Sequence, residues 1–222
     1  MAFSFSPSLV IFDCDGVLVD TEPVANRALA RFLGECGFEI SYEECRRLFV
    51  GRTMQAVQAY VEEATGRPLG EDWPERIRDE TLKAFAEGIE PVGGAREVLE
   101  ALAASETPYC VASSGRFEKM RFTLGATELL PLVDGVLFSA EEVAHGKPAP
   151  DLFLHAASRM KHAPERCLVI EDSVPGVQAA VAAGMSVIGY AGDPMTDAVA
   201  LEREGAHVIS DMSALIGLLI EG

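Results

Sequence analysis

Residues Leu9–Glu22, with the sequence LVIFDCDGVLVDTE, decide the fold of this chain. Four consecutive apolar residues lead into Asp13 and Asp15, and Gly16 follows at once. A short apolar run that ends in a turn signal predicts a strand buried on both faces, as in a parallel sheet. Two acids at the end of a buried strand need a cation or strong hydrogen-bond donors nearby. Because ligands of open α/β sheets bind at the carboxyl ends of the strands, the stretch predicts a metal-assisted active site.

The composition is that of an acidic globular protein. The chain has 222 residues, of which 49% are hydrophobic and 24% are charged, and its formal net charge is −17. Binding to nucleic acid requires clustered basic residues, so this charge argues against a nucleic-acid partner. No apolar segment approaches the roughly 20 residues that span a bilayer, which argues against a membrane protein. The first residues, MAFSFSPS, lack the basic and apolar regions of a secretory signal, so we expect a cytoplasmic protein and, by default, a monomer.

The five cysteines show no CxxC spacing, which argues against a structural zinc site and against a disulfide framework. Cys14 lies between Asp13 and Asp15. Alternate side chains of an extended strand face opposite ways, so we expect Cys14 to point away from both carboxylates. No histidine lies near it in the sequence to activate a thiolate, which makes a catalytic cysteine the weaker hypothesis.

The rest of the chain has two different textures. Most of residues 22–90 carry apolar side chains at helical spacing, in segments that end near glycines, which predicts a helical bundle. From Pro91 onward, strand-like runs such as GVLFSAE (135–141) alternate with helical runs, which predicts βαβ units and a parallel sheet. The simplest architecture is an α/β fold: a three-layer Rossmann-like core of residues 1–21 and 91–222, into which an α-helical cap domain of residues 22–90 is inserted.

Polar side chains gather at the predicted strand ends. Parallel strands deliver their last residues to the same edge of a sheet, so side chains far apart in the sequence should meet there. They are Asp13 and Asp15 after the first strand, Ser113 and Ser114 at the end of YCVASS, Lys147 in the loop HGKPAPD, and Glu171 and Asp172 at the end of CLVIED. Taken singly, each has a simpler reading as a surface turn, a helix cap or a solvated charge. Their convergence in one alternating pattern favours an active site.

This set of side chains fits phosphoryl transfer. The carboxylates of Asp13 and Asp172 are hard oxygen ligands that suit Mg²⁺, whose shell a substrate phosphate would complete. Ser113, at a strand-to-helix turn, can bind a phosphate oxygen, and Lys147 can supply positive charge to the same phosphate. A carboxylate can then attack phosphorus to give an aspartyl-phosphate, while the second aspartate protonates the leaving oxygen and later activates water.

The same motifs, in this order, resemble those of the haloacid dehalogenase superfamily, specifically its phosphatase and β-phosphoglucomutase-like branch with a small α-helical cap. DCDGVLVDTE resembles the first motif, the serine of VASSG the second, the lysine of GKPAPD the third and EDSVPGVQAA the fourth. The resemblance implies that Asp13 is the nucleophile and that Asp15 is the general acid/base, which also offers its backbone carbonyl to Mg²⁺. It further implies that Asp172 is a metal ligand, that Glu171 is a ligand or a neighbour of the ligands, and that Ser114 assists in binding phosphate.

Two positions depart from the family pattern. Many β-phosphoglucomutase-like members have a histidine where this chain has Ala25, and the cap arginine of sugar phosphomutases is matched only loosely by Arg52. We therefore expect a Mg²⁺-dependent phosphatase of a small phosphorylated metabolite, either a sugar phosphate or a sugar-acid phosphate. A phosphomutase and a non-catalytic binding protein on the same fold are the alternatives. Glu22, Arg52 and Arg116 are the candidate contacts to the rest of the substrate.

Overall fold

The computed structural model describes residues 6–49 and 52–220, which form two compact units. One unit, here named the core unit, joins the segment up to Asp20 to the chain from Glu90 onward. The other, the helical unit, is the continuous segment Thr21–Ile89. Residues 1–5, on which the expectation about a secretory signal depends, lie outside the described part of the chain. The assignment of the two units as catalytic core and cap stays a prediction.

The core unit is built on one parallel sheet. Among the described residues, six strands pair in the order β3-β2-β1-β4-β5-β6. Their bounds are β1 (Leu9–Phe12), β2 (Tyr109–Ser113), β3 (Leu137–Ser139), β4 (Cys167–Glu171), β5 (Ser186–Tyr190) and β6 (His207–Ile209). The chain runs outward from β1 in one direction through β2 and β3, and in the other through β4 to β6. Such a reversal opens a crevice at the carboxyl ends of the central strands, where α/β proteins bind ligands.

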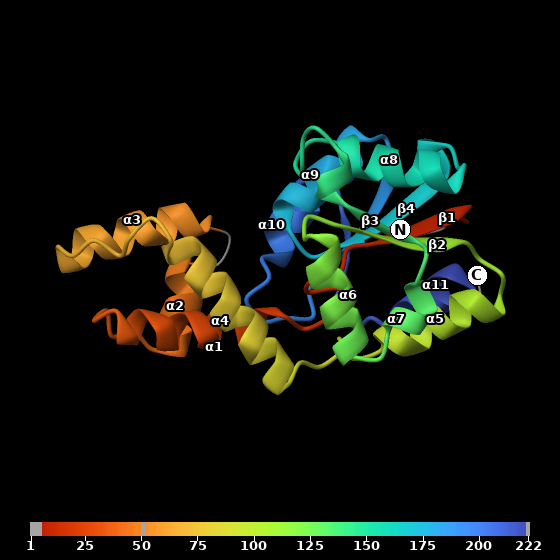
Figure 1. The fold of residues 1–222 in the computed structure, drawn as a ribbon. Helices are drawn as coiled ribbons and strands as arrows, with labels where there is room; N and C mark the ends of the chain where they lie inside the picture. The colour runs from red at the N-terminus through yellow and green to blue at the C-terminus, as the bar shows by residue number, and fades with distance from the viewer. Residues whose placement is uncertain (1–5, 50–51, 221–222) are drawn as a thin grey trace. The chain divides into compact units, whose positions relative to one another are not determined.

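Helices cover both faces of this sheet (Figure 1). One layer contains α8 (Asp151–Met160), α9 (Val174–Ala182) and α10 (Ala198–Arg203); the other contains α5 (Ala95–Ala104), α6 (Phe117–Ala126), α7 (Leu130–Val133) and α11 (Ala214–Leu219). Strand β1 shows why both layers are needed. Leu9 and Ile11 pack in the cluster that contains α8 and α9, Val10 and Phe12 alternate with them, and all four are 0% exposed. The predicted three-layer Rossmann-like α/β fold is confirmed.

The helical unit contains α1 (Glu22–Glu35), α2 (Tyr42–Phe49), α3 (Met54–Thr65) and α4 (Trp73–Glu87). Its apolar cluster includes Phe32 and Trp73, whose ring centroids lie 6.2 Å apart. Local signals fix the ends of α3. The Thr53 hydroxyl accepts from the Ala56 N–H at 3.2 Å, and Gly66 ends the helix in the left-handed conformation that glycine adopts readily.

The structure differs from expectation between residues 130 and 142. The strand expected over 135–141 ends at Ser139, because Ser139 caps a 3₁₀ helix, η1 (Ala140–Glu142). Its hydroxyl accepts from the Glu141 N–H at 3.1 Å, and its own N–H donates to Glu142 Oε2 at 3.1 Å. The short helix α7 was not expected at all. Within the described ranges, no helix has the length and apolar character that crossing a membrane requires.

Candidate active site

The pairing of β1 with β4 brings Asp13 next to Glu171. Phe12 lies opposite Ile170, and the Asp13 N–H continues the ladder by donating to the Ile170 carbonyl oxygen at 2.9 Å. Both acids are nearly inaccessible, with 7% of Asp13 and 1% of Glu171 exposed. Asp172 follows directly and is half-buried. Strand register therefore gathers three carboxylates from two distant segments.

Lys147 lies between two of these acids. Its Nζ donates to Asp13 Oδ1, to Glu171 Oε1 at 2.8 Å and to the Ala112 carbonyl oxygen at 3.2 Å. The lysine side chain is 4% exposed, and Nζ lies 4.8 Å from the centre of the Phe153 ring, within cation–π range. An ammonium group has three donors, so these contacts use all of them. Lys147 thus holds both carboxylates in place.

The pKa values of this cluster show an excess of negative charge. Burial raises the pKa of Asp13 from its usual 3.8 to about 7, because the charge of Lys147 does not fully offset desolvation and the repulsion of Glu171 and Asp15. Burial also opposes the charge of Lys147, but Asp13 and Glu171 outweigh it and raise the pKa of the lysine. A further cation bound here would relieve the repulsion between the carboxylates.

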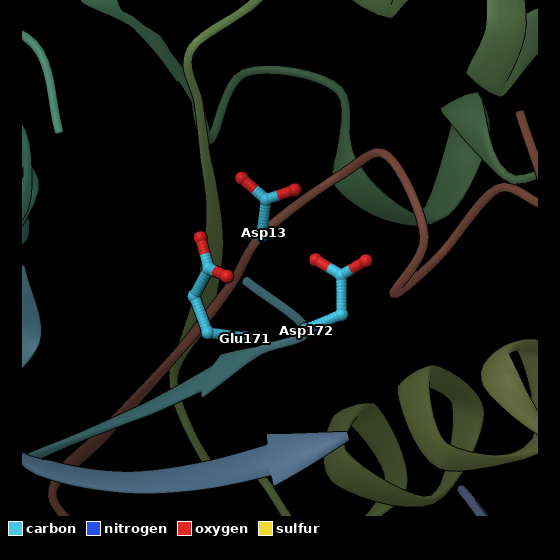
Figure 2. Close-up of side chains that lie close together, drawn as sticks. All are labelled: Asp13, Glu171 and Asp172. Carbon is cyan, nitrogen blue, oxygen red and sulfur yellow. The ribbon is translucent and has the colours of Figure 1, made fainter. Parts of the chain in front are cut away.

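Asp13, Glu171 and Asp172 form a set that can hold a metal ion (Figure 2). One carboxylate oxygen from each lies within 4.8 Å of the others, and the three side chains stand at the ends of the neighbouring strands β1 and β4. Carboxylate oxygens are the hard ligands that Mg²⁺ prefers. Gly16 leaves room for one of these acids, because a β-carbon there would come 2.1 Å from Asp172 Oδ2. The donor set and the charge therefore fit a divalent cation.

Glu171 is engaged on both oxygens. Oε1 accepts from Lys147, and Oε2 accepts from the Ser173 N–H at 2.7 Å and from the Ser173 hydroxyl at 2.9 Å. Ser173 is the N-cap of α9, and its hydroxyl oxygen accepts from the Gly176 N–H at 3.1 Å. Glu171 therefore ties Lys147 to the start of α9, which favours Asp13 and Asp172 as the main ligands of a metal.

Asp15 is bound by a different lysine, Lys119. Lys119 Nζ donates to Asp15 Oδ2 at 2.8 Å from the first turn of α6. The other oxygen, Asp15 Oδ1, is buried and has no hydrogen-bond partner within the residues that the structure describes. Sequence reasoning missed Lys119. A signal was present, because a lysine in the first turn of a helix opposes the helix dipole and so needs a reason to be there.

Ser113 lies at the end of β2, close to Asp15. It is 1% exposed, and its hydroxyl oxygen accepts from the Gly115 N–H at 3.0 Å. A β-carbon on Gly115 would lie 3.4 Å from Ser113 Oγ and 3.7 Å from Asp15 Oδ2, which shows how closely this turn approaches both residues. The Ser139 hydroxyl donates to the Gly115 carbonyl oxygen at 2.7 Å and holds the turn in place. Ser114 is exposed beside it.

The three candidate contacts to the rest of the substrate have other surroundings. Arg116 is exposed, and its Nε lies 3.8 Å from a carboxylate of η1. Glu22 and Arg52 belong to the helical unit. There Glu22 Oε2 accepts from the Asn26 side-chain amide at 2.8 Å, and the Arg52 guanidinium lies 5.8 Å from the centre of the Tyr60 ring. Their roles stay predictions.

Known proteins share both the sequence and the fold. The model of the haloacid dehalogenase-like hydrolase family matches residues 7–184. The 6-phosphogluconate phosphatase of Escherichia coli (strain K12) is 34% identical over 186 residues, which are 83% of this chain and 83% of that protein. The phosphorylated carbohydrates phosphatase of Thermotoga maritima is 29% identical over 212 residues, 96% of this chain and 98% of that one. The crystal structure of a haloacid dehalogenase family hydrolase from Deinococcus radiodurans R1, with bound phosphate and sodium, has a TM-score of 0.83 at 32% identity and covers 96% of this chain and 97% of its own.

Proposed function

Because the chain belongs to the haloacid dehalogenase-like hydrolases and is a phosphoric monoester hydrolase, we propose that it hydrolyses a small phosphorylated sugar or sugar acid through an aspartyl-phosphate on Asp13. One observation carries the proposal. The two acids at the end of β1 are bound by different lysines, Asp13 by Lys147 and Asp15 by Lys119. Two carboxyl groups in different environments can take different tasks in one reaction.

Asp13 is the nucleophile of this mechanism. Lys147 binds Oδ1 and so immobilises the carboxylate, while Glu171 and the Ala112 carbonyl fix the lysine. In the first step an Asp13 oxygen forms a bond to phosphorus, and the bond from phosphorus to the ester oxygen of the sugar breaks. Lys147 also places positive charge beside the transferring phosphate, which stabilises the charge that develops on it.

Asp15 moves the protons. It gives a proton to the ester oxygen as that oxygen leaves with the electron pair of the broken bond. It then takes a proton from a water molecule, whose oxygen bonds to phosphorus and displaces Asp13. Inorganic phosphate is released, and both acids return to their starting states.

We assign Mg²⁺ to Asp13, Asp172 and the backbone carbonyl of Asp15, with Glu171 as a ligand or a neighbour of the ligands. The acidic set at the strand ends supports this assignment. When bound, the ion would supply positive charge that neutralises the phosphate and lowers its repulsion toward an attacking carboxylate.

Ser113, Ser114 and Lys147 are proposed to bind the phosphate. Lys147 would act through its charge, because its three donors are already engaged within the protein. The Ser113 oxygen accepts from the Gly115 N–H, so its own proton is left to donate to a phosphate oxygen. Ser114 follows it in the exposed turn before α6 and would assist through its backbone N–H. The phosphate bound in the Deinococcus radiodurans relative supports a phosphate site on this fold.

The relatives favour a sugar substrate, since one acts on 6-phosphogluconate and another on phosphorylated carbohydrates. The helical unit would serve as the cap that closes over the site and excludes water. Glu22 and Arg52 from that unit, and Arg116 from the core unit, would contact the part of the substrate that does not react. The five cysteines are free thiols, which suits a reducing compartment such as the cytoplasm.

A phosphate-release screen tests this function. The purified protein is incubated with Mg²⁺ and a panel of sugar phosphates, sugar-acid phosphates and other metabolite phosphates. We expect release of inorganic phosphate that excess EDTA abolishes. In Asp13→Asn, phosphate release should fall by about 10⁴-fold or more, while the variant remains folded and still unfolds cooperatively on heating. Conversion of a sugar 1-phosphate into its 6-phosphate, with little free phosphate, would identify a phosphomutase instead, and no turnover of any ester would indicate a binding protein.

A further inference from the structure

We propose that Lys119 is a positioning residue that decides which oxygen of Asp15 carries the proton during the reaction. The inference rests on the proposed function, because it concerns the proton transfers assigned to Asp15. Lys119 Nζ donates to Asp15 Oδ2 at 2.8 Å across 104 residues of sequence. Asp15 Oδ1 is buried and lacks a hydrogen-bond partner in the described part of the chain. The two oxygens of this one carboxyl group therefore have different surroundings.

The location of Lys119 is unfavourable on local grounds. The first turn of an α-helix is the positive end of its dipole, where acids are stabilised and cations are not. Lys119 lies in that turn of α6, and its side chain is 35% exposed, so water only partly compensates for the position. Natural sequences break such local rules mainly at functional sites. The ion pair with Asp15 supplies the reason for keeping a lysine here.

The ammonium group of Lys119 determines which oxygen of Asp15 is favoured to carry a proton. An ammonium group donates and cannot accept. Asp15 Oδ2 can therefore serve Lys119 only as an acceptor, and a proton on Oδ2 would weaken that bond. The proton of the carboxylic acid is thus favoured on Oδ1, the oxygen that no described side chain or backbone group binds. Lys119 thus directs the proton to Oδ1, a buried oxygen that the substrate must uncover when it binds.

The surroundings limit other arrangements of the pair. A β-carbon on Gly115 would lie 3.6 Å from Lys119 Cδ and 3.7 Å from Asp15 Oδ2, so the turn at Gly115 lies close to both partners. The backbone of Asp15 is also fixed, because Asp15 forms a β-bridge with Val19 and the Gly16 N–H donates to the Val19 carbonyl oxygen at 2.8 Å. Loss of Lys119 would free the Asp15 carboxyl to turn about its side-chain bonds.

The two steps of the reaction then use one oxygen. In the first step an Asp13 oxygen bonds to phosphorus, and the proton on Asp15 Oδ1 passes to the ester oxygen, which keeps the electron pair of the breaking bond to phosphorus, while Asp15 Oδ2 stays bound to Lys119. In the second step a water molecule returns a proton to Asp15 Oδ1 as its oxygen bonds to phosphorus and the bond from phosphorus to Asp13 breaks. A sugar alkoxide needs the first of these protons to leave, whereas a p-nitrophenolate ion leaves without one. The loss of rate on removing Lys119 should therefore be larger for a substrate with an alkoxide leaving group than for one with a p-nitrophenolate leaving group.

The test compares two substrates in Lys119→Met, with Mg²⁺ present. They are the alkyl phosphate that is turned over fastest in the screen, with 6-phosphogluconate tried first, and p-nitrophenyl phosphate. We expect kcat/KM to fall by about 10²-fold for the alkyl phosphate, as loss of a well-placed general acid does, and to change little for p-nitrophenyl phosphate. Lys119→Arg keeps a cationic donor and should restore much of the alkyl rate. The ratio of the two rates within one variant does not depend on the fraction of protein that is folded.

Lys83→Met is the matched control, because Lys83 forms an ion pair of similar length, 2.7 Å to Glu80 Oε1, on a side chain that is 68% exposed. It should leave both rates unchanged.

Equal losses on the two substrates in Lys119→Met overturn the proposal; if inhibition by inorganic phosphate also weakens, Lys119 is a phosphate ligand instead. If Asp15→Asn loses the same factor in rate on both substrates, Asp15 is not the general acid, and the inference about Lys119 fails with it. If the wild-type protein releases phosphate from neither substrate nor any ester of the screen, the proposed function itself fails.

Discussion

Gly176, in the first turn of α9, lies directly against the carboxylate of Glu171. A β-carbon on Gly176 would come 1.8 Å from Glu171 Oε1 and 1.9 Å from its Cδ. Glu171 is the acid that shares Lys147 with Asp13, so the space left by this glycine is part of the candidate active site. Glycine inside a helix is destabilising by roughly 0.5–1 kcal/mol relative to alanine, and the fit to Glu171 explains why it is kept here.

Gly176→Ala should therefore destabilise the protein although alanine is the better helix former. We expect the free energy of unfolding to fall by about 1–3 kcal/mol, as overpacking a buried site does, and phosphate release to fall as Glu171 and Lys147 are displaced. Urea unfolding measures the first effect. Gly217→Ala is the control, since nothing lies within 4 Å of the added carbon in α11, and it should be neutral or stabilising. A gain of stability in both variants would mean that Glu171 can move aside without loss.

Lys147→Met should remove the cation that balances Asp13 and Glu171. The lysine side chain is 4% exposed, so water cannot take its place, and removing one partner of a buried ion pair destabilises by about 3–5 kcal/mol. We expect that loss in urea unfolding with EDTA, and partial recovery when Mg²⁺ is added. The exposed pair of Lys83 with Glu80 provides a comparison, because water screens this pair and Lys83→Met should change stability far less than Lys147→Met does. Similar effects in the two variants would contradict the role of Lys147 as a buried counter-charge.

The pKa of Asp13 predicts how stability depends on pH in the metal-free protein. Burial raises this pKa from 3.8 to about 7, so the folded protein binds the Asp13 proton more tightly than the unfolded chain does. The stability that Asp13 contributes is therefore fully present below about pH 4 and is lost as the pH rises toward 7. Asparagine does not titrate, so Asp13→Asn does not lose this stability as the pH rises. With EDTA present, the free energy of unfolding of Asp13→Asn should therefore increase relative to that of the wild type between pH 5 and pH 8.

Urea unfolding of both proteins at several pH values measures that difference. Mg²⁺ favours the ionised form of a carboxylate, so saturating Mg²⁺ should reverse the advantage of Asp13→Asn at pH 8. Parallel pH curves for the two proteins in EDTA would show that Asp13 titrates alike in the folded and unfolded chains.

Native alkylation should distinguish the cysteines and test the weaker hypothesis of a catalytic thiol. Cys14 is 0% exposed, and burial, followed by the charges of Asp15 and Asp13, raises the pKa of its thiol. Cys36 alone among the five cysteines is not fully buried. We expect iodoacetamide at pH 8 to label Cys36 in the folded protein and the other four only after unfolding, as followed by mass spectrometry. Rapid labelling of Cys14 with loss of activity would contradict this assignment.

The polar side chains at the strand ends could be predicted from the sequence because each follows an apolar run. Asp13, Ser113 and Asp172 each come at the end of such a run, and a parallel sheet brings these ends to one edge whatever the order of its strands. Lys119 was not accessible in the same way. Its contact with Asp15 requires that α6 begin near Phe117 and that its first turn face β1, and packing sets both.

The pattern of apolar runs and acids in the chain was thus enough to predict the fold class and the kind of chemistry, because burial and charge follow from residue type and spacing. The pairing of Asp13 with Lys147 and of Asp15 with Lys119 came from the folded molecule. A lysine side chain is long enough to reach any of several acids, and strand register together with burial selects one of them. The capped turn that ends β3 at Ser139 and the short helix α7 also depend on local hydrogen bonds and packing. Segments of three or four residues are too short to show a periodic pattern from which such features could be predicted.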